Sequence, residues 1–68
     1  MATQTKSTSG NTTTYIITDV EGNFVTVNAL QAPGQVITTT FNSSGNIHQD
    51  AQQMLTTLMQ LISTNLLP

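Results

Sequence analysis

Residues Thr14–Leu30 read TYIITDVEGNFVTVNAL and predict a β-hairpin. Its two halves, Thr14–Glu21 and Phe24–Leu30, are rich in threonine, β-branched and aromatic residues, which favour strands. Gly22-Asn23 between them suits a two-residue type II′ loop, because glycine reaches the positive φ of the first position without strain. This loop sets a register that gathers apolar residues on one face. The expected pairs are Val20 with Val25, Thr18 with Val27, and Ile16 with Ala29.

A third strand is predicted after a turn. Ala32–Gln35 should form a type II turn, since proline occupies its second position and Gly34 its third. The turn returns the chain for a strand over Gln35–Phe41, whose two faces are both of mixed polarity. Asn42–Gly45 then reads as a loop.

The C-terminal segment, residues 47–66, predicts one amphipathic helix. Asn46 and Gln49 have the spacing of a capping box, and Asp50 lies in the first turn, where the helix dipole favours an anion. Apolar residues recur at helical spacing and form a broad stripe of roughly 160° of the circumference. The stripe widens towards the C-terminus, where Met59 and Leu66 join it.

The predicted fold is therefore α+β: a three-stranded antiparallel meander followed by one C-terminal amphipathic helix, with a polar N-terminal arm. The arm, residues 1–13, reads MATQTKSTSGNTT and has no apolar periodicity. We expect such a segment to be disordered alone and to be held by a neighbouring chain. Residues 14–68 are expected to form a single small domain.

Charged residues are unusually few. Lys6, Asp19, Glu21 and Asp50 are the only ones, and the net charge is −2, whereas about 25% of residues are charged in ordinary soluble domains. Threonine, serine, asparagine and glutamine supply the polar surface instead. Because an unpaired ion is costly to desolvate, charges are depleted at the cores of interfaces. The composition therefore favours a chain covered by neighbouring chains; a lightly charged monomer is the alternative.

The same composition argues against several partners. Arginine is absent and Lys6 is the only basic residue, so no electrostatic footprint for nucleic acid or an anionic membrane is present. No apolar stretch approaches the length of a transmembrane helix. The first ten residues lack the apolar run of a signal peptide, so cytoplasmic synthesis is expected. Cysteine is absent, which excludes disulfides and thiolate metal sites.

Few side chains can carry chemistry. His48 is the only histidine, so a histidine metal pair or a histidine triad is not available within one chain, and a structural position at the helix start is expected. Asp19, Glu21 and Asn23 offer oxygens around the hairpin of the kind that bind Ca²⁺ weakly, but a solvated acidic turn is the simpler interpretation. No catalytic, cofactor-binding or metal-binding residue is predicted.

The sequence thus predicts a non-enzymatic structural or assembly protein that acts through other protein chains. A small virion component, such as a capsid decoration or a tail-associated subunit, is the leading hypothesis; a binding or regulatory module that caps one protein partner is the alternative. Met54, Met59 and the leucines could also form a peptide-binding groove, although core and interface packing is the commoner role of such residues. The residues expected at an interface are Ile47, Met54, Met59, Leu66 and Leu67.

Overall fold

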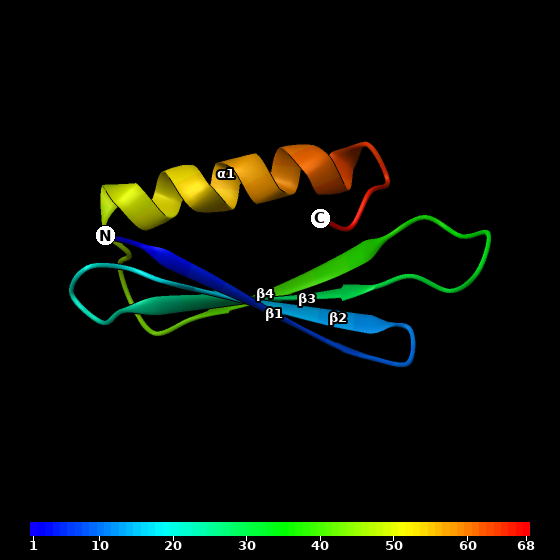
Figure 1. The fold of residues 1–68 in the computed structure, drawn as a ribbon, viewed down its shortest axis with the longest axis horizontal. Helices are drawn as coiled ribbons and strands as arrows, with labels where there is room; N and C mark the ends of the chain where they lie inside the picture. The colour runs from blue at the N-terminus through cyan, green and yellow to red at the C-terminus, as the bar shows by residue number, and fades with distance from the viewer.

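The computed structural model describes residues 1–68 as a four-stranded antiparallel sheet with one helix on one face (Figure 1). The strands follow one another in the sheet in chain order. The helix lies above the sheet in the figure, and both chain termini lie on that same side. The elements are β1 (Thr3–Ser9), β2 (Thr12–Thr18), β3 (Phe24–Leu30), β4 (Thr38–Ser43) and α1 (Gln49–Ser63).

The α+β class is confirmed, but the expectation of three strands is wrong. Thr3–Ser9, expected within a polar arm, forms β1 and pairs along its whole length with β2. All seven of its side chains are exposed, so hydrophobic burial does not hold this strand. It is held by the backbone ladder and by a two-residue loop at Gly10-Asn11, where Gly10 has a φ of 59°. Glycine followed by asparagine favours a two-residue hairpin loop, and here it joins β1 to β2.

The predicted register of the second hairpin is also wrong. Val25 pairs with Ile17 rather than with Val20, and Val27 pairs with Tyr15. The loop has five residues, because the last pair of the two strands is Thr18 with Phe24. Within the loop, the Asp19 backbone N–H donates to the Asn23 carbonyl at 2.8 Å. This register turns the other face of β2 towards the core, as expected when the pairing of a strand changes by an odd number of residues.

The predicted turn at Ala32–Gln35 has the expected features. The Gln35 N–H donates to the Ala32 carbonyl at 3.0 Å, and Gly34 has a φ of 76°. The strand after it starts later than predicted, at Thr38, because Thr38 is the residue that pairs with Leu30. Residues 31–37 therefore form a loop, and the strand extends to Ser43.

The helix is shorter than the predicted range of residues 47–66. His48, not Asn46, is its N-cap, with extended backbone angles (φ −65°, ψ 157°). At the other end, Asn65 adopts a φ of 64° and its N–H donates to the Ile62 carbonyl at 2.8 Å. The Leu66 N–H donates to the Leu61 carbonyl at 3.3 Å, which completes a Schellman motif that ends the helix.

The core lies between the helix and the central strands. Tyr15, Ile17 and Val27 are fully buried on the helix side of the sheet, and Leu58 packs on them from α1. The alternation of buried and exposed residues along β2 and β3 follows the pleat of a sheet covered on one face. The buried apolar residues are Ala2, Tyr15, Ile17, Val25, Val27, Ala29, Ala51, Leu58 and Ile62.

Candidate interaction surfaces

The face of the sheet opposite α1 is not covered by any other part of the chain, and we call it the open face. The strand registers place fifteen side chains on it, four from each of β1, β2 and β3 and three from β4. Eight of them are threonine, and none is charged. They are Thr3, Thr5, Ser7, Ser9, Thr12, Thr14, Ile16, Thr18, Phe24, Thr26, Asn28, Leu30, Thr38, Thr40 and Asn42.

Three large apolar side chains, Ile16, Phe24 and Leu30, are exposed on the open face. Ile16 pairs with Thr26, so Phe24 is its diagonal neighbour on the adjacent strand, within the reach of large side chains. Polar groups on this face also bond to one another, since the Thr14 hydroxyl donates to Asn28 Oδ1 at 2.9 Å. The open face therefore combines an apolar pair with side-chain hydroxyls and amides that carry no charge.

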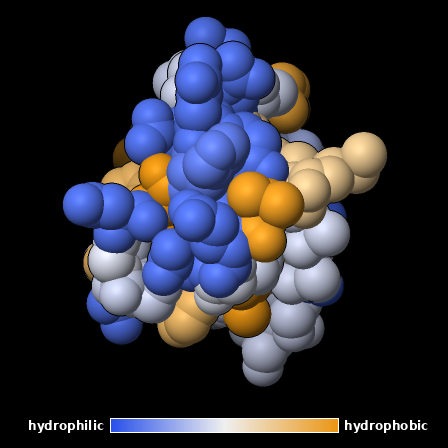
Figure 2. Space-filling view, turned by 90° about the vertical axis from the view of Figure 1, so that its left-hand side faces the viewer, coloured by the Kyte–Doolittle hydropathy of each residue, from blue (hydrophilic) through white to orange (hydrophobic).

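All four charged residues lie elsewhere. Lys6 is on the helix side of β1, as its pairing with the buried Tyr15 shows. Asp19 and Glu21 belong to the loop between β2 and β3, and Asp50 is in the first turn of α1. Figure 2 views the end of the molecule at which α1 begins; hydrophilic residues occupy its middle, and hydrophobic groups lie separated along its sides. That end offers no continuous apolar surface.

The Asp19 carboxylate is buried and accepts three backbone hydrogen bonds. Oδ1 accepts from the N–H groups of Glu21 and Asn23, and Oδ2 accepts from the N–H of His48, each at 2.8 Å. Burial alone raises the pKa of Asp19, but the hydrogen bonds from His48, Glu21 and Asn23 outweigh it and hold the pKa below its ordinary value of 3.8. Both oxygens are thus engaged in joining the loop to the helix start, which leaves Asp19 poorly suited as a Ca²⁺ ligand.

His48 caps α1 and lies beside Asp50. Its Nδ1 is 3.0 Å from Asp50 Oδ1 and 3.4 Å from the Asp50 backbone nitrogen. One ring nitrogen cannot donate to the carboxylate and accept from the N–H at once, and the shorter contact with the carboxylate is the better hydrogen bond. Asp50 Oδ1 also accepts from the Ala51 N–H at 2.8 Å. This arrangement stabilises the first helical turn, and no further group converges on it that would act in acid–base chemistry.

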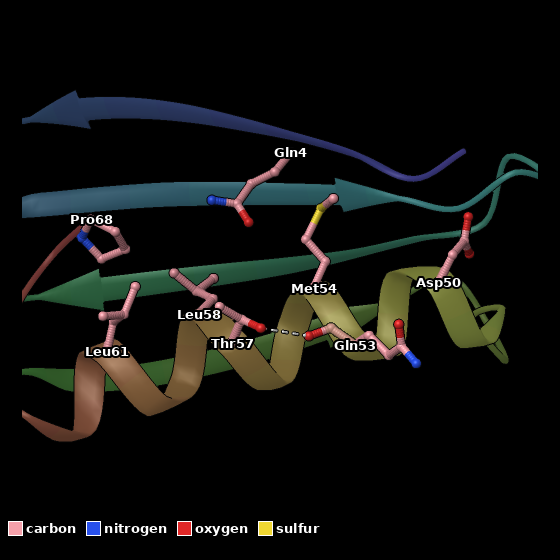
Figure 3. Close-up of a pocket in the computed structure, with 8 residues that line it drawn as sticks. All are labelled: Gln4, Asp50, Gln53, Met54, Thr57, Leu58, Leu61 and Pro68. Atoms are coloured by element: carbon pink, nitrogen blue, oxygen red, sulfur yellow. Dashed lines mark hydrogen bonds between the residues drawn. The ribbon is translucent and has the colours of Figure 1, made fainter.

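A shallow groove of about 380 Å³ lies between α1 and β1 (Figure 3). Met54 and Leu58 extend from the helix towards the strands in the figure, and Gln4 of β1 lies across from them. The chain end closes one side of the groove, where the Tyr15 hydroxyl donates to the Pro68 carbonyl at 2.8 Å. The lining residues are Gln4, Asp50, Gln53, Met54, Thr57, Leu58, Leu61 and Pro68.

Of the five residues predicted at an interface, four are partly buried and pack against the chain's own core. These are Ile47, Met54, Met59 and Leu67. Leu66 is 59% exposed and free to contact another chain. The sequence did not single out the open face, because Thr12–Thr14 and Thr38–Thr40 are unbroken runs of threonine that do not alternate and so do not mark one face of a strand.

The chain contains no group of three or more histidine, cysteine, aspartate or glutamate side chains that could hold a metal ion. Its one helix is too short and too polar to cross a membrane. No protein-family model matches the chain, and neither a curated protein nor a solved structure is significantly similar to it.

Proposed function

We propose that this chain is a non-enzymatic structural subunit that acts through protein–protein contacts within a larger assembly. The observation that carries this proposal is the uncharged open face, on which fifteen side chains project from four strands. A surface without ions can be covered by a neighbouring protein at little desolvation cost. A small virion component, such as a capsid decoration or a tail-associated subunit, fits such a chain, because a component of this kind functions in contact with neighbouring subunits.

The ionisable groups support a role without catalysis. Both oxygens of the Asp19 carboxylate accept backbone hydrogen bonds, and Asp50 is engaged with His48 and the Ala51 N–H. General acid–base catalysis needs a group that is free to exchange a proton with a substrate in a cleft. Neither of these carboxylates meets that requirement, and Glu21 lies exposed in a loop.

The groove between α1 and β1 favours a second candidate function, a binding module that caps a single protein partner. Met54, Leu58 and Leu61 provide its apolar floor, and the exposed strand β1 forms its rim. An extended peptide could lie along this rim and pair with the strand. A module of this kind would bind one partner and would not form an assembly of many copies.

The proposal is tested by placing a charge on the open face. Thr26→Lys introduces an ammonium group opposite Ile16, and Gln60→Lys introduces the same charge on the exposed side of α1. Light scattering and sedimentation velocity on the full chain should show assemblies larger than a dimer for the wild type and for Gln60→Lys. Thr26→Lys should lose them, because an ammonium group buried at a neutral interface has no partner.

Folding is checked by circular dichroism for each variant. Thr5→Lys repeats the test at an exposed position on the same face, opposite Ile16 on β1, in case the central Thr26 does not tolerate lysine. If both open-face variants fold and assemble as the wild type does, the open face is not the contact surface and the proposal is wrong. A wild type that never exceeds a dimer also contradicts it, and it would favour the capping module.

A further inference from the structure

The outer edge of β4 presents unpaired backbone groups at alternate residues. The Ser44 N–H donates to the Phe24 carbonyl at 3.0 Å. In an antiparallel ladder this sets the even-numbered residues of β4 towards β3 and the odd-numbered residues outward. Thr39, Phe41 and Ser43 therefore direct both N–H and C=O away from the sheet.

The outer edge of β1 is built in the same way but carries a charge. The Gln31 N–H donates to the Asn11 carbonyl at 2.9 Å, which sets the odd-numbered residues of β2 towards β3. By the register of β1 with β2, Gln4, Lys6 and Thr8 are then the outward-directed residues of β1. Lysine in the middle of an edge strand is a common means of preventing edge-to-edge pairing.

No such protection exists on β4, which contains neither a charged residue nor proline. Its Phe41 lies on the helix side beside the fully buried Val27, yet its side chain is 51% exposed. With 100° per residue, Leu55 and Met59 lie on the flank of α1 away from the β1 groove, and so towards β4. This side of the molecule therefore holds an apolar strip next to an open backbone edge.

The start of the β4 edge is already closed within the chain. The Ile37 N–H, which precedes the strand, donates to Asn65 Oδ1 at 3.0 Å. A further strand can therefore pair only with the segment that begins at Thr39. This limits the edge to the five residues Thr39–Ser43.

We propose that two copies of this chain pair through β4, antiparallel about a twofold axis at Phe41, to form one eight-stranded sheet. Phe41 then lies opposite the partner's Phe41, and Thr39 lies opposite the partner's Ser43. This inference rests on the proposed function and names the first partner, a second copy. Each outward-directed residue meets another outward-directed residue, as hydrogen-bonded pairs of an antiparallel ladder require.

The edge is self-complementary, which is why a second copy is the occupant. Across a twofold axis, each residue lies near the same residue of the partner chain or near one of that residue's neighbours. Any charge on the edge would therefore face a like charge. On β4 there is none, whereas pairing through β1 would bring two Lys6 ammonium groups together. The two Phe41 rings would lie side by side on the helix side, where cross-strand aromatic pairs are favourable.

The register follows from the same constraints. A shift by one residue would set outward-directed groups opposite groups that already bond to β3. A shift by two residues would need either the Ile37 N–H, which Asn65 occupies, or the Gly45 backbone, whose N–H and C=O both bond to Ser43 Oγ. Because the axis is perpendicular to the sheet, both helices lie on one side and the two open faces join on the other.

A matched pair of proline variants tests the edge. Thr39→Pro removes one outward N–H from β4, and Thr8→Pro removes one from β1, while the ladders within the chain keep their donors. Proline is tolerated on edge strands when its missing N–H faces solvent. Sedimentation equilibrium of the full chain, at concentrations below those at which larger assemblies form, should give a dimer for the wild type and Thr8→Pro. For Thr39→Pro the dissociation constant should rise roughly tenfold or more, since each dimer loses two donors.

Single cysteines test the register, since the chain has none of its own. Residues in a hydrogen-bonded pair have Cα atoms about 5.5 Å apart, a distance that a disulfide spans. Under mild oxidation Phe41→Cys should therefore form a covalent dimer. Ser43→Cys should not, because the two Ser43 positions lie roughly 13 Å apart along the strands.

A wild type that stays monomeric at all concentrations overturns the inference, and so does dissociation caused by Thr8→Pro in place of Thr39→Pro. Covalent dimers of Ser43→Cys but not of Phe41→Cys reject the register. Failure here is separable from failure of the proposed function. If Thr39→Pro still enters large assemblies that Thr26→Lys cannot form, the β4 pairing is wrong and the assembly role stands.

Discussion

The carboxylate of Asp19 accepts a hydrogen bond from the backbone N–H of His48 at 2.8 Å. These residues are 29 positions apart, one directly after β2 and the other at the N-cap of α1. The contact joins the loop between β2 and β3 to the start of the helix. It also satisfies the His48 N–H, which has no partner within the helix because it lies at the helix start.

Asp19 should make the stability of the fold depend on pH in the acid range. Its pKa is lower in the folded chain than the ordinary value of 3.8, so the unfolded chain binds the proton first as pH falls. Stability is then fully present above pH 3.8 and decreases as pH falls through the folded pKa. Thermal melts between pH 2 and pH 6 should show this decrease for the wild type and a smaller one for Asp19→Asn. Glu21→Gln is the control, since Glu21 is exposed. If the pH dependence of the melting temperature changes equally in both variants, its assignment to Asp19 is wrong.

Tyr15 should make stability depend on pH in the alkaline range. Burial raises the pKa of its hydroxyl above 10.0, so the unfolded chain loses the proton first and stability falls as pH rises past 10. Tyr15→Phe should remove this fall and, at neutral pH, lower the free energy of unfolding by about 1 kcal/mol through loss of the hydrogen bond to Pro68. Chemical denaturation at pH 7 and pH 11 measures both effects. If Tyr15→Phe loses as much stability between pH 7 and pH 11 as the wild type does, another group is responsible for the pH dependence.

Gly22 should not tolerate a side chain, although space is open around it. Its φ is 89°, and a Cβ added there would meet nothing within 4 Å. The cost of Gly22→Ala is therefore conformational, roughly 1 kcal/mol in the free energy of unfolding. A synthetic chain with D-alanine at this position adopts positive φ without strain and should be as stable as the wild type or more so. Equal losses for both enantiomers would point to a steric cause instead.

Removal of residues 1–11 should destabilise the fold, since β1 pairs with β2 along seven residues and Ala2 is buried. The melting temperature should fall. Amide hydrogen exchange provides the specific readout, because alternate residues of β2 bond to β1 and to β3. The amides of Thr12, Thr14, Ile16 and Thr18 should lose protection, whereas those of Thr13, Tyr15 and Ile17 should keep more of it. An equal loss of exchange protection in the two sets of amides would contradict the predicted alternation.

Met59 and Leu66, which the sequence placed together at an interface, should respond differently to glutamine. Met59 packs against the core, so Met59→Gln should cost roughly 1–2 kcal/mol of stability through lost apolar burial. Leu66 is 59% exposed, so Leu66→Gln should stay within about 0.5 kcal/mol. Denaturation of the two single variants, at a concentration where the chain is monomeric, separates these contributions. A large loss for Leu66→Gln would mean that the chain end is packed more tightly than its exposure indicates.

The sequence alone determined those elements whose stabilisation is local or follows a clear apolar period. Phe24–Leu30 forms the predicted strand, and the apolar spacing of residues 47–66 located the helix and its buried Leu58. The turn with Pro33 and Gly34 also forms where it was predicted, because both residues restrict the backbone by themselves.

Only the tertiary structure decided the rest, because it depends on partners distant in the chain. The polar β1 has no apolar pattern, and its order comes from backbone hydrogen bonds to β2. The register of β2 depends on Asp19, whose carboxylate builds a five-residue loop and reaches His48 at the helix start. The open face exists because one short helix covers one side of a four-stranded sheet, and the register then collects the threonines on the other. The alternation of side chains along a strand determines which residues share a face, but it does not determine which face is buried. Packing against α1 determines which face is buried.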